Sequence, residues 1–197
     1  MKRTLIILSA ILLLLPVYCI YGYHGLGTHF QDAGREEGQT LVMFWNLENL
    51  FDWRRDTLGG NESEAEFSSF GKKHWTKRRF LAKCNAIAKS IFWVKDKEGS
   101  LPDVIGIAEV ENRFVLERLL RETPLYKTDY RIVHFDSPDP RGIDVALLYR
   151  SSSLELIQAK PIAVGGGTDP PFRTRDILLA RFRKPDGDSL AFLVNHH

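Results

Sequence analysis

The sequence has few cysteines and no large excess of charge of either sign. It contains 2 cysteines, 27 Lys plus Arg and 25 Asp plus Glu in 197 residues. Only Cys84 lies outside the N-terminal apolar stretch, so we expect no internal disulfide and no paired-thiol metal site. Cys19 follows the bulky Tyr18, which disfavours lipid attachment there. A net charge of +2 does not by itself indicate a nucleic-acid partner.

The composition excludes a disordered or collagen-like chain. Hydrophobic residues make up 44% and charged residues 26% of the sequence, which is typical of one ordinary globular domain. No internal repeat is present. We therefore expect a single core, stabilised by packing rather than by covalent links.

The N-terminus has the pattern of a secretory signal. Lys2-Arg3 precedes an apolar run from Leu5 to Leu15. Extended to Tyr23, the run approaches the roughly 17–25 residues that span a bilayer, so an uncleaved anchor is the alternative. We expect residues 1–23 to be a signal peptide or membrane anchor and residues 24–40 a linker. The protein would then be exported, to a periplasmic, extracellular or membrane-anchored location.

The remaining sequence alternates between strand and helix patterns and then becomes rich in strands. The predicted elements are a strand at 40–45, a helix at 73–94, a strand at 103–108, a helix at 112–122, and strands at 130–135, 143–149, 154–164, 177–182 and 189–195. A hairpin is expected at Pro185-Asp186-Gly187-Asp188, a surface loop at 52–70 and a flexible connection at Gly165–Gly167. This order predicts a mixed α/β sheet with helices on one side.

Polar side chains accompany the ends of these strands. Asn46 and Glu109 follow apolar strands, Arg141 and Asp144 lie at the start of another, and His196 follows the last. Ligand sites of open sheets form at strand ends, which favours a shared site. Taken singly, each residue has a structural explanation, such as a turn for the asparagine or a helix N-terminal acid for the glutamate.

Four sequence blocks carry a family resemblance. They are FWNLENLF at 44–51, PDVIGIAEVEN at 102–112, RGIDVALLY at 141–149 and FLVNH at 192–196. Their order resembles the endonuclease/exonuclease/phosphatase family across residues 41–197. The resemblance implies an α/β fold, the N-terminal part of a four-layer sandwich, in a domain that looks truncated at its C-terminal side.

The resemblance also implies roles for individual residues. Glu109 would bind Mg²⁺, with Mn²⁺ as an alternative ion, and Asn46 would help to hold the metal and the phosphate. His196 would be catalytic and contact the scissile phosphate. Hard cations prefer carboxylate and amide oxygens, and a transferring phosphoryl group needs donors around its oxygens.

Two arginines are candidates for phosphate binding. Arg141 and Arg175 have planar guanidinium groups that suit phosphate. A structural ion pair is an equal alternative for each, Arg175 with Asp176 or with Asp144. Asp144 lies between apolar neighbours, and we expect it to contact the site residues rather than the substrate or the metal.

The implied function is hydrolysis of phosphodiester or phosphomonoester bonds, with nucleic acid or a phospholipid head group as substrate. The alternative is a membrane-anchored, catalytically inert fragment that binds phosphate. Family members carry Asp-x-Asn and Asp-His pairs, and this sequence contains neither. We therefore expect the chain alone to be inactive and to leave an apolar sheet face uncovered. The basic residues between Lys72 and Lys89 are interpreted as a solvated helix face rather than a nucleic-acid surface.

Overall fold

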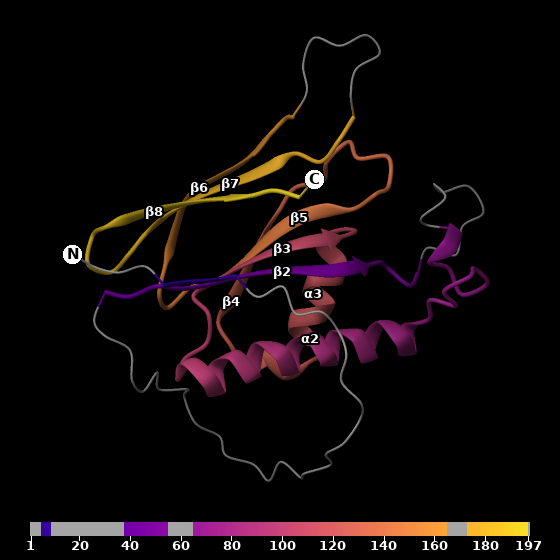
Figure 1. Cartoon of the computed structure of the whole chain (residues 1–197), viewed down its shortest axis with the longest axis horizontal. Helices are drawn as coiled ribbons and strands as arrows, with labels where there is room; N and C mark the ends of the chain where they lie inside the picture. Colours follow the sequence, from indigo (N-terminus) through magenta and orange to yellow (C-terminus); the bar gives the residue numbers. More distant parts are fainter. Residues whose placement is uncertain (1–4, 9–37, 55–64, 165–172, 197) are drawn as a thin grey trace.

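The structure is a computed structural model that describes residues 5–8, 38–54, 65–164 and 173–196 (Figure 1). The first sheet has the strand order β1-β2-β3-β5-β4. Its strands are β1 (Leu5–Leu8), β2 (Leu41–Leu50), β3 (Val104–Val110), β4 (Tyr130–His134) and β5 (Asp144–Arg150). The pairs β1–β2 and β2–β3 are parallel, whereas β5 is antiparallel to both β3 and β4.

Two helices follow the parallel strands. Helix α2 (Lys77–Glu98) begins at the N-cap Thr76, whose side chain accepts a hydrogen bond from the Arg79 amide, and ends at Gly99 with a φ of 75°. A left-handed residue after a helix is a common stop, and glycine adopts that conformation without a steric cost. Helix α3 (Arg113–Arg121) has Asn112 as its N-cap, and the short 3₁₀ helix η1 (Pro124–Lys127) follows it.

The second sheet is a three-stranded antiparallel meander. It contains β6 (Glu155–Ile162), β7 (Ile177–Arg183) and β8 (Ser189–Val194) in the order β6-β7-β8. The β7–β8 hairpin closes through hydrogen bonds from the Lys184 amide to the Asp188 carbonyl and from the Gly187 amide to the Lys184 carbonyl. The turn predicted at 185–188 is therefore present.

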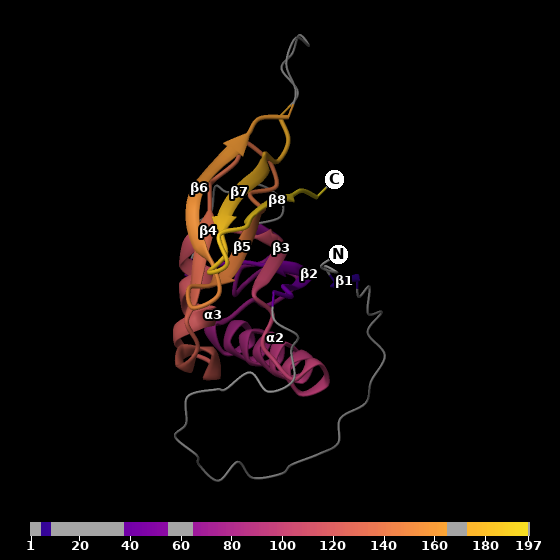
Figure 2. The same ribbon diagram turned by 90° about the vertical axis from the view of Figure 1, so that its left-hand side faces the viewer.

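The molecule has three layers, helices, first sheet and second sheet, as Figure 2 shows. Side chains alternate across the first sheet, so each of its faces has its own core. On the helix side, Ile105, Ile107 and Leu148 pack with Phe80 and Leu116. The opposite face packs against the second sheet through the buried residues Val104, Ala108, Val145, Leu147, Leu178, Phe182 and Val194.

The predicted α/β architecture is confirmed, but the uncovered face lies elsewhere than expected. The first sheet is covered on both sides, because β6–β8 pack against the face that the helices leave free. The second sheet instead exposes its outward side, where Leu193 keeps 61% of its surface accessible. On that side Leu179 lies opposite Leu193, with Ile177 next to it on β7. On β6, Ile162 lies opposite Ile177 and Lys160 opposite Leu179. We call Leu193, Leu179, Ile177 and Ile162 the outer apolar face.

Two predicted strands end later than expected. β2 continues to Leu50 and β3 to Val110, so Asn46 and Glu109 lie within strands and not after them. The predicted apolar runs end where polar side chains begin, whereas Asn46 still pairs with Ala108 and pairing resumes at Leu50 and Val110.

The predicted export segment is described only in part. Residues 5–8 form β1, which pairs with β2 so that Leu5 lies opposite Leu41. The rest of residues 1–23, and the predicted connection at 165–167, lie outside the described residues, as does most of the predicted loop at 52–70. Within the described part of the chain, no helix is both long and apolar enough to cross a bilayer.

Candidate active site at the edge of the two sheets

Asn46 presents its amide nitrogen, and not its oxygen, to the neighbouring strand. Its Oδ1 accepts a hydrogen bond of 2.8 Å from the Glu48 backbone amide. Its Nδ2 then lies 3.0 Å from Glu109 Oε1. A backbone N–H can only donate, so this contact fixes which side of the Asn46 amide carries the oxygen.

Glu109 lies in a bulge between β3 and β5. Ala108 pairs with Val145 and Val110 with Asp144, so Glu109 is an extra residue without a partner on β5. Its φ of 62° is in the left-handed region, which is unfavourable for a residue with a side chain. Bulges redirect side chains and are frequent beside active sites. This one directs the Glu109 carboxylate towards β2 instead of continuing the strand alternation.

His196 reaches the same point from the second sheet. Its Nε2 lies 3.2 Å from Asn46 Nδ2 and 3.5 Å from Glu109 Oε1. The two hydrogens of the Asn46 amide can therefore serve the carboxylate and a neutral imidazole whose Nε2 carries the lone pair. The His196 and Glu109 side chains remain 21% and 15% exposed, so the group is accessible from solvent.

Gly106 lies where β3 meets Phe44 of β2 and Val194 of β8. A Cβ at Gly106 on β3 would lie 3.0 Å from the Phe44 ring and 3.5 Å from a Val194 methyl group. Val194 ends β8 two residues before His196. The missing side chain thus leaves room for the Phe44 ring, while the 3.5 Å to Val194 would be an ordinary contact.

These contacts decide how the three residues suit a metal ion. Glu109 offers a carboxylate oxygen, the ligand that Mg²⁺ and Mn²⁺ prefer. Asn46 turns its N–H donors towards Glu109, because its oxygen faces the Glu48 amide. The group therefore fits one carboxylate ligand with two neighbouring groups that contact an anion or orient the carboxylate.

The two predicted arginines come together on a residue that the sequence did not single out. Asp139 Oδ2 lies 3.2 Å from Arg175 Nε and 3.6 Å from Arg141 Nη2. Its Oδ1 accepts a hydrogen bond from the Arg141 backbone amide. Arg175 thus pairs with Asp139, whereas the sequence suggested Asp176 or Asp144. The sequence does carry one signal for this role of Asp139, which is its place two residues before Arg141 in an Asp-Pro-Arg-Gly turn.

Arg175 is a buried cation whose guanidinium group is incompletely hydrogen-bonded. It is 6% exposed, and its Nη1 has no hydrogen-bond partner among the described residues. Its Nε is within ion-pair distance of Asp139 but is not aligned for a hydrogen bond. Burial lowers the pKa of Arg175, as does the nearby Arg141, while Asp139, Glu109 and Asp144 oppose the shift. Two guanidinium groups on one carboxylate suit a further anion.

Asp144 supports the loop before β5. Its Oδ1 accepts hydrogen bonds from the Ser137 amide at 3.1 Å and from the Ser137 hydroxyl, and its Oδ2 lies 3.3 Å from His134 Nε2. Asp136 approaches the other ring nitrogen, Nδ1, at 4.0 Å. His134, Asp136 and Asp144 could hold a metal by proximity. The two carboxylates nevertheless lie beside different ring nitrogens, which matches a buried His–Asp pair better than one shared ion.

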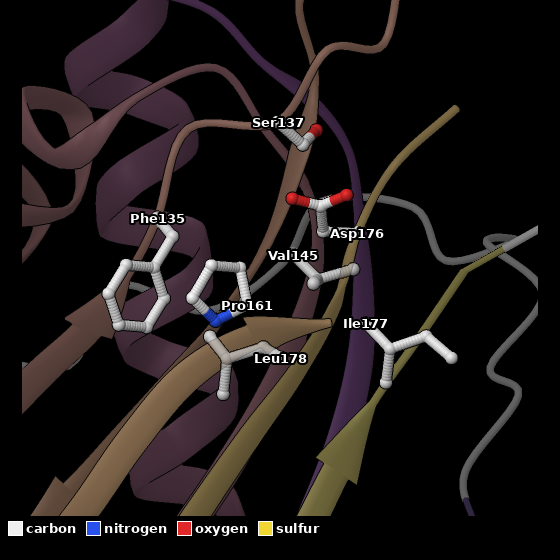
Figure 3. A pocket seen from close by; sticks show the side chains of 7 residues that line it. All are labelled: Phe135, Ser137, Val145, Pro161, Asp176, Ile177 and Leu178. Carbon is white, nitrogen blue, oxygen red and sulfur yellow. The ribbon is translucent and has the colours of Figure 1, made fainter. Parts of the chain in front are cut away.

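A small pocket lies beside this loop and apart from the Asn46–Glu109–His196 group (Figure 3). Ser137 and Asp176 lie on one side of it, and Phe135, Pro161 and Leu178 form an apolar side. The lining is mostly apolar, so this pocket does not suit a phosphate ester.

The basic residues around the start of α2 are exposed, as predicted for a solvated face. Lys77, Arg78 and Arg79 occupy its first turn, which has no acidic residue. Some of these cations lie over aromatic rings, among them Lys77 over Trp53 at 5.8 Å. A first turn without acids is unfavourable for the helix dipole and leaves this surface positive.

Comparison with known proteins gives a family match and similar solved folds. The model of the Endonuclease/Exonuclease/phosphatase family matches residues 41–197. No match was found among curated protein sequences. The human Nocturnin catalytic domain with bound sulfate anion is 17% identical, with a TM-score of 0.47 over 76% of this chain and 46% of that chain.

Two Bacteroides thetaiotaomicron structures are also similar. One is an endonuclease/exonuclease/phosphatase family protein, 15% identical with a TM-score of 0.47 over 78% of this chain and 47% of that chain. The other is a mannosyl-6-phosphatase, 14% identical with a TM-score of 0.46 over 78% of this chain and 50% of that chain. The chain thus spans about half of the length of these structures or less, and the likeness concerns the fold alone. Because the family match covers most of the sequence, the chain belongs to the endonuclease/exonuclease/phosphatase family.

Proposed function

We propose that the intact protein hydrolyses phosphodiester or phosphomonoester bonds with the help of a divalent cation. One observation carries this proposal: Asn46, Glu109 and His196 come from β2, β3 and the end of β8 and meet within 3.5 Å. Contacts across two sheets would be an improbable result of helix capping or turn formation. The family membership of the chain supports the same chemistry.

Each residue has a role that follows from the atom it presents. Glu109 would hold Mg²⁺ or Mn²⁺, which when bound polarises the phosphoryl group and makes water more acidic. Asn46 donates from Nδ2 and so keeps the Glu109 carboxylate in place or contacts a phosphoryl oxygen. His196 Nε2 would contact the scissile phosphate as a hydrogen-bond donor when it carries a proton, because phosphate oxygens only accept.

Arg141 and Arg175 would bind the phosphate oxygens. Their shared contact with Asp139 leaves one carboxylate between two guanidinium groups, which favours an additional anion. Electrostatic donors around a phosphoryl group stabilise the charge that develops in its transition state. Nucleic acid and phospholipid head groups both remain candidate substrates, and a panel of phosphate esters on the intact protein would distinguish them.

The decisive variant is Glu109→Gln. It keeps an oxygen that accepts from Asn46 but removes the charge that a cation needs. Mutation of a residue that only supports a metal ligand typically lowers metal affinity or activity by about 10–100-fold. Loss of a direct ligand should cost more, so we expect at least about 100-fold lower Mg²⁺-dependent turnover of a chromogenic phosphodiester. The melting temperature should change little, because Glu109 is not part of the apolar core.

Glu117→Gln is the matched control, since Glu117 lies on α3 and pairs with Arg113 at the surface. It should retain full turnover. Unchanged turnover in Glu109→Gln together with a large fall in melting temperature would mean that Glu109 is structural. Phosphate binding without any hydrolysis by the intact protein would favour the inert phosphate-binding fragment.

A further inference from the structure

The backbone that follows Asn46 is unusual and determines how Asn46 is oriented. Asn46 pairs with Ala108 and Leu50 with Val110, so three residues of β2 face the single residue Glu109. Two of the three, Glu48 and Asn49, have φ values of 55° and 65°. Neither is glycine, so both pay a steric cost that other contacts must offset.

This irregular segment supplies the hydrogen bond that orients the Asn46 side chain. The Glu48 amide donates to Asn46 Oδ1 at 2.8 Å, and Asn46 Nδ2 consequently faces Glu109. If Glu48 adopted ordinary strand geometry, its amide would point along the sheet ladder. The position of Asn46 Nδ2 therefore depends on the left-handed conformation of its neighbours.

Lys83 of α2 is placed to hold that conformation. Its Nζ donates to the Glu48 carbonyl at 2.5 Å and to the Asn49 carbonyl at 3.4 Å. The same ammonium lies 5.6 Å from the centre of the Trp75 ring, while Trp75 Nε1 donates to the Phe51 carbonyl at 2.8 Å. One cation thus binds the two carbonyls of the strained residues, and charge-assisted bonds of this kind are stronger than neutral ones.

Keeping the Lys83 ammonium in this position costs free energy, because burial removes water from around its charge. Burial lowers the pKa of Lys83, and the carboxylates of Glu48 and Glu109 oppose that shift. A lysine on a helix face could otherwise extend into solvent, as Lys89 does six residues later. The contact with two carbonyls explains why Lys83 turns towards β2.

We propose that Lys83 is a positioning residue, which holds the Glu48–Asn49 segment in its left-handed conformation and thereby aims the Asn46 amide at Glu109. Its effect on catalysis rests on the proposed phosphoesterase function. Its effect on geometry does not, because both hydrogen bonds belong to the free protein.

The test is Lys83→Met in the full chain, with amide hydrogen exchange and the Asn46 side-chain NH₂ resonances as readouts. Methionine keeps the apolar stem over Trp75 and removes the charged donor. We expect exchange of the Glu48 amide to accelerate about tenfold or more, the size expected for losing a charge-assisted hydrogen bond. The Asn46 NH₂ resonances should shift, while the amides of Ala88 and Ile91 on α2 keep their protection.

Two further variants make the result specific. Lys89→Met removes a lysine from the exposed side of α2 and should leave Glu48 and Asn46 unchanged. Lys83→Arg keeps a cation with several donors and should preserve the protection of the Glu48 amide. If Lys83→Met does not fold, Lys83→Arg becomes the test of the proposal. Faster hydrogen exchange of the Glu48 amide in Lys83→Arg than in the wild-type chain would then overturn the proposal.

Other outcomes separate this inference from the proposed function. Unchanged Glu48 exchange in Lys83→Met, or faster exchange spread evenly over α2, would overturn the positioning role. An altered Asn46 signal with normal turnover of the intact Lys83→Met protein would overturn the link to catalysis. If Glu109→Gln also kept full turnover, the proposed function would fail while the positioning role would stand.

Discussion

At the residue scale, the orientation of one amide group decides what the candidate site offers a ligand. Side-chain type alone suggested that Asn46 supplies an oxygen to a metal, as is proposed for Glu109. The Glu48 backbone amide donates to that oxygen, so Asn46 turns its N–H donors towards Glu109. A hydrogen-bond donor such as Asn46 and a proposed metal ligand such as Glu109 should respond differently to substitution. Asn46→Asp should therefore be more disruptive than its size suggests, because a carboxylate would face Glu109.

Cys84 gives a prediction for the pH dependence of stability. Burial raises the pKa of the Cys84 thiol to about 12, from an ordinary value of 9.0. Between these two values the unfolded chain releases the proton and the folded chain keeps it, so stability is complete below pH 9 and falls as pH rises. From pH 8 to pH 10 we expect this thiol to cost about 1.4 kcal/mol of unfolding free energy.

Urea unfolding under reducing conditions at the two pH values measures this cost. Cys84→Ala is the comparison, since it is less stable overall but lacks the buried thiol. The wild-type chain should lose more unfolding free energy between pH 8 and pH 10 than Cys84→Ala does. Equal losses in the two proteins would show that the thiol ionises in the folded state.

Single residues show where prediction from the sequence reaches its limit. Asn46, Glu109 and His196 could be selected because each accompanies an apolar strand, and the structure brings the three together. Asp139 and Lys83 could not, because their partners are fixed by a turn and by backbone carbonyls rather than by a spacing of side chains. The pairing of Arg175 was assigned to the wrong aspartates for the same reason.

At the element scale, hydrophobic periodicity located the helices and strands but not their irregularities. The helix predicted at 112–122 matches α3 with its N-cap Asn112 and C-cap Glu122. The helix predicted to start at residue 73 begins at Lys77, because Thr76 provides the cap. The bulges at 47–49 and at Glu109 have no sequence signal, since both contain ordinary side chains at positive φ.

The N-terminal segment gives a prediction about export. We propose that residues 1–23 direct the chain across or into a membrane, on the basis of the basic start and the apolar run. Residues 1–40 fused to a reporter that is active only outside the cytoplasm should give a signal, whereas a fusion that begins at residue 24 should not. Activity confined to the cytoplasm would contradict the proposal.

The mass of the exported protein then distinguishes cleavage from anchoring. A cleaved segment removes β1, so β2 would become an edge strand of the first sheet. An uncleaved chain retains residues 5–8. Open edges promote association between chains, so the cleaved form needs another strand, or a covering segment, beside β2.

At the scale of the whole molecule, the outer apolar face predicts how the chain behaves in solution. Leu193 is the most exposed of its four residues, and pairing places Leu179 directly opposite it. Large contiguous apolar areas are unusual on soluble monomers. We expect the full chain to bind apolar fluorescent dyes and to associate at high concentration.

Leu193→Glu tests this prediction. It should reduce dye fluorescence and light scattering with little change in unfolding free energy, because Leu193 is already largely in water. Ala191→Glu adds the same charge to the same side of β8 but removes no large apolar group, so it should have a smaller effect. A monodisperse, dye-negative wild-type chain would contradict the prediction.

The contact between Asn46 and His196 joins residues 150 positions apart in the sequence. It requires both sheets to be formed and packed, since the two residues share no local structure. Such distant pairings form only after a large loss of chain entropy, so the complete site should appear among the last events of folding. A cation or phosphate that bound all three residues would then select the fully assembled molecule from partly folded ones, and its binding energy would add to the stability of the whole domain. In a cell, the ligand would act as a check that synthesis and folding had been completed.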